Sequence, residues 1–285
     1  MKRSIIPVVA IAFAVACCSG QKRNAADPEP ETTYSEAVVY EGKDVIFRQI
    51  DEHTWEGNGH MVYNESVYIV EGSEKALLID AGTQIERLDS IVATITDKPV
   101  TLVATHVHPD HTGSAVKDFS EIWINMADMP NVKNMMPDFK GDICFLRDGQ
   151  IFDLGGRDIE VMFTPGHTPG SVTFFDKAAG YGFSGDAFGS TNLLLTTDFS
   201  TLIFTCTRAS KYMEENGIVK LYPGHYHGDN PETLQRVNDL LTMSEETLAG
   251  KRHGKKVPGI ASMGLNRIVE DFGVKIRYKD PDGLK

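Results

Sequence analysis

The sequence predicts a domain of the α/β (α+β) class. One observation is a series of short β-branched or aromatic segments separated by turn residues, which is typical of sheet strands. A second is apolar spacing that fits helices over 84–95, 199–215 and 231–248. Strands and helices also recur in two blocks of similar size, without a short internal repeat. A fold that combines β-sheet with helices follows from these patterns.

Composition limits the function classes. The chain has 285 residues, which is enough to bury a full core in one domain or two. Apolar residues make up 41% and charged residues 24%, as is ordinary for a globular enzyme. The net charge of −12 argues against a nucleic-acid partner, because such partners need a basic surface.

Residues 1–20 are interpreted as a lipoprotein signal peptide. A basic start precedes the apolar run 5–16, which is too short to span a bilayer comfortably. Small residues then lead into a cysteine, an arrangement that resembles a bacterial lipoprotein signal. We expect acylation at Cys17, with Cys18 as the alternative, and a plain secretory signal cut near Ala16 is the competing interpretation. The prediction is a bacterial cell-envelope protein, lipid-anchored or periplasmic.

A flexible tether and one folded domain are expected to follow. Residues 21–33 are polar, contain Pro28 and Pro30 and show no periodicity. The folded domain should cover residues 34–285, and its only membrane contact would be the N-terminal lipid anchor. Pro231 suits the first turn of the last helix, with Asn230 as its N-cap. Strands are expected at 38–40, 45–47, 61–63, 67–70, 76–79, 99–104, 122–124, 159–163, 172–175, 182–184, 218–222 and 274–278.

A dense polar cluster follows the apolar strand 99–104. Its members are His106, His108, Asp110 and His111. His106 and His108 stand two residues apart in extended chain, so both side chains can converge on one ion. Pro109 then turns the chain and aims the next two residues at a second point nearby. Such a cluster is hard to explain as core or as surface.

Three later residues repeat the same placement. His167, Asp186 and His225 each stand beyond a predicted strand, next to a glycine that lets backbone approach a crowded site. With the first cluster they give five histidines and two aspartates at strand ends. Imidazole and carboxylate ligands suit zinc, and also iron or manganese.

The ordered set resembles the metal-site pattern of the metallo-β-lactamase superfamily of metal-dependent hydrolases. The segments 78–82 and 164–170 are also similar to motifs of that family, and the resemblance spans about residues 35–278. It implies a four-layer αβ/βα sandwich with the metals in a groove at one edge. It also implies a small-molecule substrate.

The resemblance implies a role for each ligand. A first ion is expected on His106, His108 and His167, and a second on Asp110, His111 and His225. Asp186 would bridge two Zn²⁺ ions, with iron or manganese as alternatives. Two such ions share a water, lower its pKa and turn it into the attacking hydroxide. Asp110 is the expected catalytic residue, orienting the hydroxide and carrying a proton to the leaving group.

Departures from the family pattern guide the substrate class. One group of true β-lactamases has cysteine where Asp186 stands, and another lacks the bridging carboxylate. Residues 187–189 lack the tyrosine common in lactonases, and His108 disfavours the flavodiiron branch. Asp186 therefore resembles the pattern of the glyoxalase II, lactonase and phosphodiesterase side of the superfamily rather than that of the true β-lactamases. We expect hydrolysis of a small ester, thioester or lactone. The alternatives are a phosphodiesterase, a β-lactamase, or a binding protein that has lost turnover; the oligomeric state stays open.

Four further features leave alternatives open. Cys144 and Cys206 could form a disulfide or remain free thiols. His227 and Asp229 could support His225 or belong to a surface turn. The methionine-rich segment 125–139 could be packing or a mobile apolar cover over the site.

The fourth feature is the basic run 251–256, the densest in an acidic chain. It could be a solvated loop, or it could hold a carboxylate or phosphate on the substrate.

Overall fold

The computed structural model describes residues 37–58, 63–260 and 263–279. The chain divides into two units, residues 1–33 and 34–285, and the description below concerns the second. The predicted signal peptide and tether lie outside the described residues. Within the described residues, no helix combines the length and the apolar character needed to cross a membrane.

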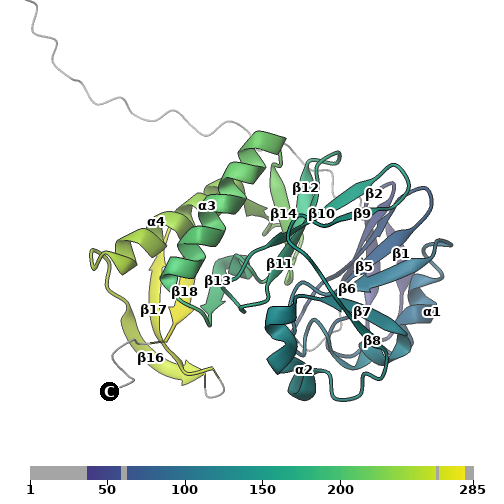
Figure 1. The fold of residues 1–285 in the computed structure, drawn as a ribbon, viewed down its shortest axis with the longest axis horizontal. Coiled ribbons are helices and arrows are strands. Elements are labelled where there is room, and N and C mark those ends of the chain that lie inside the picture. The colour runs from purple at the N-terminus through teal and green to yellow at the C-terminus, as the bar shows by residue number, and fades with distance from the viewer. Residues whose placement is uncertain (1–36, 59–62, 261–262, 280–285) are drawn as a thin grey trace, which may run out of the picture. The chain divides into compact units, whose positions relative to one another are not determined.

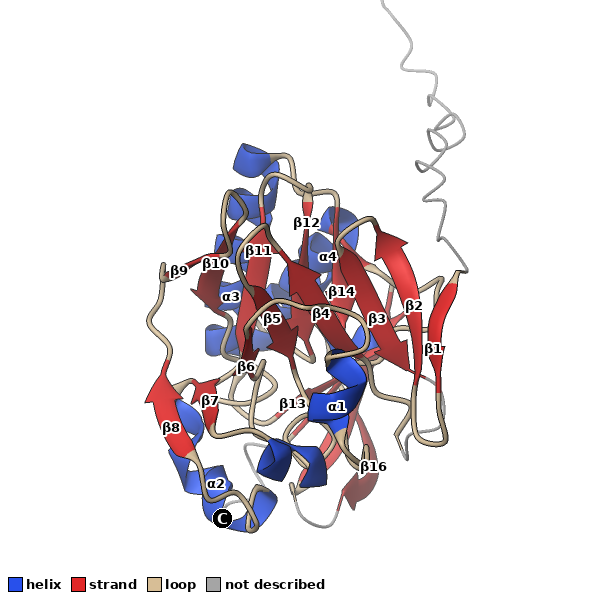
Figure 2. Cartoon of the chain, turned by 90° about the vertical axis from the view of Figure 1, so that its right-hand side faces the viewer, coloured by secondary structure: helices blue, strands red, loops and turns tan. Residues whose placement is uncertain are grey.

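The first sheet has eight strands in chain order, and its first half is an antiparallel meander (Figure 2). Its strands are β1 (Val38–Glu41), β2 (Ile46–Asp51), β3 (Thr54–Asn58), β4 (Val67–Glu71), β5 (Ala76–Ile79), β6 (Val100–Val103), β7 (Glu121–Ile124) and β8 (Asp142–Phe145). From β5 onward neighbouring strands run parallel. The connections of this parallel part carry α1 (Leu88–Val92), η1 (Ser114–Asp118), η2 (Met126–Asp128) and α2 (Met129–Met135).

The second sheet has six strands in the order β15-β14-β12-β11-β10-β9. Their bounds are β9 (Ile151–Asp153), β10 (Asp158–Phe163), β11 (Val172–Asp176), β12 (Tyr181–Gly185), β14 (Lys220–Pro223) and β15 (Glu232–Thr233). The long helices α3 (Phe199–Asn216) and α4 (Leu234–Leu248) pack beside it (Figure 1). A four-stranded sheet continues this side, formed by β13 (Asn192–Leu195), β16 (Lys255–Ile260), β17 (Leu265–Asp271) and β18 (Val274–Tyr278); the short helix η3 (Gly189–Thr191) precedes β13.

Burial on both faces of the two large sheets defines the layers. In β5, Leu77 and Ile79 pack into the apolar cluster shared with the second sheet, whereas Leu78 packs on the opposite side with Leu88 of α1. The second sheet buries Phe174 toward the first sheet and Phe175 toward α3 and α4. Burying each such side chain contributes about 1.5–3 kcal/mol. Helices, sheet, sheet and helices form the predicted four-layer αβ/βα sandwich, and the fold class is confirmed.

Two helix predictions were wrong in extent. The segment 84–95 forms an α-helix only over 88–92, because Arg87 enters in the left-handed region (φ 58°) and the chain closes with tighter i→i−3 bonds at Thr94 and Ile95. The last helix begins at Leu234 rather than Pro231. Its N-cap is Thr233, whose hydroxyl accepts from the Arg236 amide, because Glu232 and Thr233 are held in β15.

Other expectations need smaller corrections. Asn230 accepts a hydrogen bond from the His227 amide and caps no helix. The strand expected at 61–63 falls partly outside the described residues, and Tyr63 lies in a turn. Strand β3, with the sequence TWEGN, was not predicted because glycine, glutamate and asparagine are poor strand formers. All five of its residues are nevertheless buried.

Candidate metal centre

Four of the predicted ligands stand in the loop after β6. His106, His108 and His111 are buried and Asp110 is half-buried. The loop folds back on itself, since the His111 and Thr112 amides both donate to the His108 carbonyl. The turn that Pro109 was expected to cause is therefore present, and it separates the His106–His108 pair from the next two side chains.

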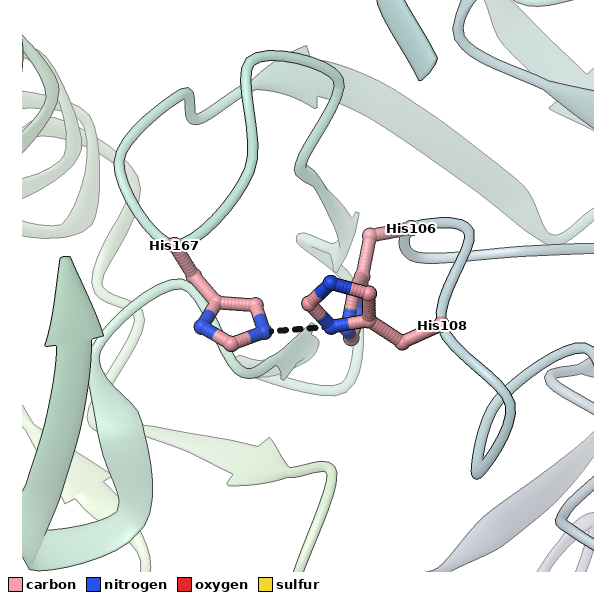
Figure 3. Close-up of side chains that lie close together, drawn as sticks. All are labelled: His106, His108 and His167. Atoms are coloured by element: carbon pink, nitrogen blue, oxygen red, sulfur yellow. Dashed lines mark hydrogen bonds between the residues drawn. The ribbon is translucent and has the colours of Figure 1, made fainter. Parts of the chain in front are cut away.

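His167 joins the first two histidines from the other sheet (Figure 3). It stands in the loop after β10, and its Nε2 lies 2.9 Å from Nδ1 of His108. Nε2 of His106 lies 3.1 Å from the same His108 atom. Three imidazole nitrogens from two sheets therefore converge on one point, as the sequence predicted for a first ion.

A second group forms around His111. Its Nε2 lies 3.9 Å from an Asp110 oxygen and 3.6 Å from an Asp186 oxygen. His225, in the loop after β14, places Nε2 3.6 Å from Asp110 and 3.5 Å from Asp186. Asp110, His111 and His225 thus form a cluster with metal-ligand spacing, as His106, His108 and His167 do.

Asp186 lies between the two groups. One of its carboxylate oxygens is 3.6 Å from His111 Nε2, and the other is 3.6 Å from His167 Nε2. It follows Gly185 (φ 51°), a left-handed position where a side chain would collide with Thr105. Gly224, just before His225, also has to be glycine, because a Cβ there would lie 2.5 Å from both Asp186 and His111.

Backbone and carboxylate partners fix which nitrogen of three histidines faces the site. Nδ1 of His167 lies 2.9 Å from the Leu194 carbonyl, and Nδ1 of His225 lies 3.2 Å from the Tyr63 carbonyl. A carbonyl oxygen only accepts, so these Nδ1 atoms carry the hydrogen and Nε2 keeps its lone pair. Nδ1 of His111 likewise donates to Asp80 at 2.8 Å.

The electrostatics divide the histidines into two kinds. Burial, together with neighbouring histidines, lowers the pKa of His108 to about 4 and holds the pKa of His106 well below its usual value. Both are neutral and able to donate a lone pair. Burial would also lower the pKa of His111, but Asp80, Asp110 and Asp186 outweigh it and raise that pKa to about 10. The pKa of His225 is raised, since Asp186 outweighs burial there too.

This donor set fits metal ions. His111 Nε2 and one Asp186 oxygen are buried without a hydrogen-bond partner, which costs free energy unless something else satisfies them. The carboxylates that favour a positive charge on His111 would equally favour a divalent cation in its place. Five imidazoles and two carboxylates form this donor set, and zinc, iron and manganese accept both kinds of ligand.

Two buried aspartates that the sequence analysis did not single out support the ligands. Asp80, at the end of β5, accepts from the Thr105 amide (2.7 Å), the Thr105 hydroxyl (2.8 Å) and His111. Asp128, at the end of η2, accepts from Val107 and from residues next to His167. The segment 78–82 gave a family-level signal for Asp80, whereas nothing local in the sequence marks Asp128.

The open alternatives from the sequence are resolved in several places. Cys144 and Cys206 are both free thiols, and burial raises the pKa of Cys206. His227 and Asp229 are exposed, and His227 contacts Asn64, so they belong to a surface turn.

The remaining alternatives concern two segments. The methionine-rich segment forms η2 and α2, and Asp128 fastens it to the ligand loops. In the basic run, Arg252 pairs with Glu246 and Asp271, both at 2.6 Å, which favours the surface interpretation over a substrate contact.

Comparisons with known proteins agree with the fold and the site. The family model described as the Metallo-beta-lactamase superfamily matches residues 60–250. The chain therefore belongs to this superfamily, and it is a metal-dependent hydrolase.

Two curated relatives are, by name, a thioesterase and a hydrolase. Human acyl-coenzyme A thioesterase MBLAC2 is 25% identical over 214 residues, which cover 60% of this chain and 76% of the relative. Hydroxyacylglutathione hydrolase GloC of Haemophilus influenzae is 28% identical over 181 residues, covering 55% and 82% respectively. A solved metallo-beta-lactamase from Pontibacter korlensis aligns with a TM-score of 0.58 at 21% identity, over 70% of this chain and 99% of that one, and supports the fold alone.

Proposed function

We propose that the chain is a dinuclear metal-dependent hydrolase of acyl thioesters, with esters and lactones as related substrates. The observation that carries the proposal is the position of Asp186, whose two oxygens face His111 of one cluster and His167 of the other. A carboxylate so placed is suited to bridging two cations. Two Zn²⁺ ions are proposed, held by His106, His108, His167, Asp110, His111, His225 and the shared Asp186.

The chain's own residues would hold the reactants and move the proton. Bound ions of this kind polarise a carbonyl and lower the pKa of a water toward neutrality. Of the two carboxylate ligands, Asp110 lies in the turn that Pro109 begins, and its side chain is 18% exposed. It can therefore orient the attacking water, take its proton and pass it to the departing thiolate. Nε2 of His225 lies 3.6 Å from an Asp110 oxygen, so its lone pair faces the same metal site as Asp110.

The surroundings favour an acyl substrate over a phosphodiester. Within the described residues, the ion pairs of Asp110 and Asp186 all involve histidines, and none involves an arginine or lysine that could also bind a phosphate oxygen. Met126 and Met129 flank the anchored Asp128 and are 59% and 38% exposed. Exposed, flexible thioether side chains on either side of a residue that contacts the ligand loops suit an apolar acyl group. The name of one relative, an acyl-coenzyme A thioesterase, supports the same class.

A substrate screen on zinc-reconstituted protein tests the proposal. Acyl-coenzyme A and S-acylglutathione thioesters, a simple ester, a lactone, a phosphodiester and a β-lactam are compared at one concentration. We expect thioesters to give the highest kcat/KM, and Asp186→Ala to abolish their hydrolysis. Asp229→Ala, at an exposed carboxylate outside the ligand set, is the matched control and should retain activity. Preferential phosphodiester or β-lactam hydrolysis would contradict the proposal.

We also propose that the enzyme works at a bacterial cell envelope, attached through a lipid on Cys17. The basic start, apolar run and small residues before this cysteine support the attachment.

A further inference from the structure

Asp128 is a buried carboxylate outside the seven ligands. It is the last residue of η2 and is 1% exposed. Removing a carboxylate from water is costly unless several hydrogen bonds replace the lost hydration. The partners of Asp128 therefore show why this residue is buried.

Its partners are parts of the two loops that carry the first histidine cluster. One oxygen accepts from the Val107 amide and from the Thr168 hydroxyl, each at 2.9 Å. The other oxygen accepts from the Gly170 amide at 2.9 Å. Val107 stands between His106 and His108, and Thr168 follows His167. A single carboxylate thus joins the loop after β6 in the first sheet to the loop after β10 in the second.

Residues next to Asp128 and Thr168 make the contact between the two loops possible. A Cβ on Gly170 would lie 2.4 Å from the Asp128 carboxyl carbon, so only glycine lets the loop come close enough. The Asn125 side chain accepts from the Ala127 amide at 3.0 Å and sets the turn that directs Asp128 inward. The Ser171 hydroxyl holds Thr168 in place. It accepts a hydrogen bond from the Thr168 amide at 3.0 Å and forms a second one with the Thr168 hydroxyl, also at 3.0 Å.

The distance between the two loops matters for metal binding. Zinc–imidazole bonds are about 2.0–2.1 Å long and tolerate little error, so the histidines must be held at a fixed separation. Besides the Asp128 bonds, the loops are joined by the Val172 amide, which donates to the Thr105 carbonyl at 2.8 Å. Supporting partners of this kind set ligand orientation and affinity.

We propose that Asp128 is a positioning residue that holds His106 and His108 at a fixed distance from His167. The inference rests on the proposed metal centre and deepens it. Asp128 touches no ligand side chain and acts through the backbone and hydroxyl groups beside them.

Zinc affinity of Asp128→Asn tests the inference. The amide has the same size, but its NH₂ group must face either the Gly170 amide or the Val107 amide, which are both donors. We expect the dissociation constant of the tighter zinc ion, measured by competition with a chromophoric chelator, to rise about 10- to 100-fold. Cobalt-substituted Asp128→Asn should show a weakened visible band. Thr168→Val, which removes one bond and keeps the carboxylate, should give a smaller change in the same direction.

Asp176→Asn is the matched control. Asp176 is also fully buried, where it pairs with Arg157 at 2.6 Å and accepts from the Ala179 amide, in contact with none of the ligand loops. This variant should unfold at lower urea concentration and bind zinc as the wild type does.

Zinc affinity and cobalt spectra of Asp128→Asn that match the wild type would overturn the inference, as would a loss of stability alone, as in Asp176→Asn. Absence of zinc binding by the wild-type chain would instead overturn the metal centre itself, and the inference with it.

Discussion

Replacing Asp80 should weaken both the fold and the metal centre. Its carboxylate is buried, and it accepts hydrogen bonds from the Thr105 amide, the Thr105 hydroxyl and Nδ1 of His111. Asp80 also adopts a left-handed backbone conformation (φ 64°), which aspartate and asparagine tolerate better than other residues with a Cβ. Asp80→Ala and Asp80→Asn therefore differ in a way that separates the backbone effect from the loss of charge.

The structure sets the size of the expected loss. In Asp80→Ala the Thr105 hydroxyl can turn to His106 Nδ1, 3.2 Å away, but the Thr105 amide and the His111 Nδ1–H keep no acceptor. Each orphaned buried donor costs about 1–3 kcal/mol. A left-handed alanine adds about 1–2 kcal/mol. We expect Asp80→Ala to lose about 3–8 kcal/mol, much of a typical total of about 5–15 kcal/mol. Asp80→Asn keeps the backbone and one oxygen and should lose about 1–3 kcal/mol.

Urea unfolding of the metal-free proteins measures these losses, with tryptophan fluorescence and far-ultraviolet circular dichroism as two probes. Chelator competition then gives the zinc affinity of Asp80→Asn, which should fall about 10- to 100-fold because His111 loses its charged partner. An Asp80→Ala variant within about 1 kcal/mol of wild type would refute the reasoning, because one orphaned donor alone should cost that much.

Three further predictions concern catalysis, pH and attachment. Asp110→Asn should lower kcat for thioesters by about 10²- to 10⁴-fold while leaving the first zinc bound, and near wild-type kcat would exclude Asp110 as the proton carrier. Burial raises the pKa of Glu232 to about 8, so the folded state keeps a proton that the unfolded state releases, and stability should fall between about pH 4.5 and 8. The urea midpoint of Glu232→Gln should fall less than that of the wild type over that pH window. Parallel pH curves for the two proteins would contradict the raised pKa of Glu232. Cys17→Ser should move the protein out of the membrane fraction; release only by Cys18→Ser would shift the acylation site by one, and release by neither would exclude the anchor.

The ligands could be predicted from sequence because their signals are local. His106 and His108 share a strand end, and His167, Asp186 and His225 each follow a strand and adjoin glycine. The structure brings all of them together. Composition and spacing alone gave the fold class, while the resemblance gave the four layers.

The supporting contacts could not be predicted because they depend on residues distant in the chain. Asp128 meets Val107 and Gly170 across 21 and 42 positions. Thr233 replaces Asn230 as the cap of α4 because pairing of β15 with β14 outweighs local capping preference. Strand β3 has polar residues that only tertiary partners make acceptable, such as Glu56, which accepts from the Ser66 hydroxyl at 2.9 Å.

The zinc content of the folded chain tests the central claim most directly. Protein purified without chelator, reconstituted with zinc and freed of excess metal should contain about two zinc ions per chain by elemental analysis, because seven ligands exceed the four that one tetrahedral ion uses. Asp186→Ala should contain about one or fewer, since it removes the residue shared by both clusters. A wild-type ratio that stays at one or below after reconstitution would contradict the dinuclear centre.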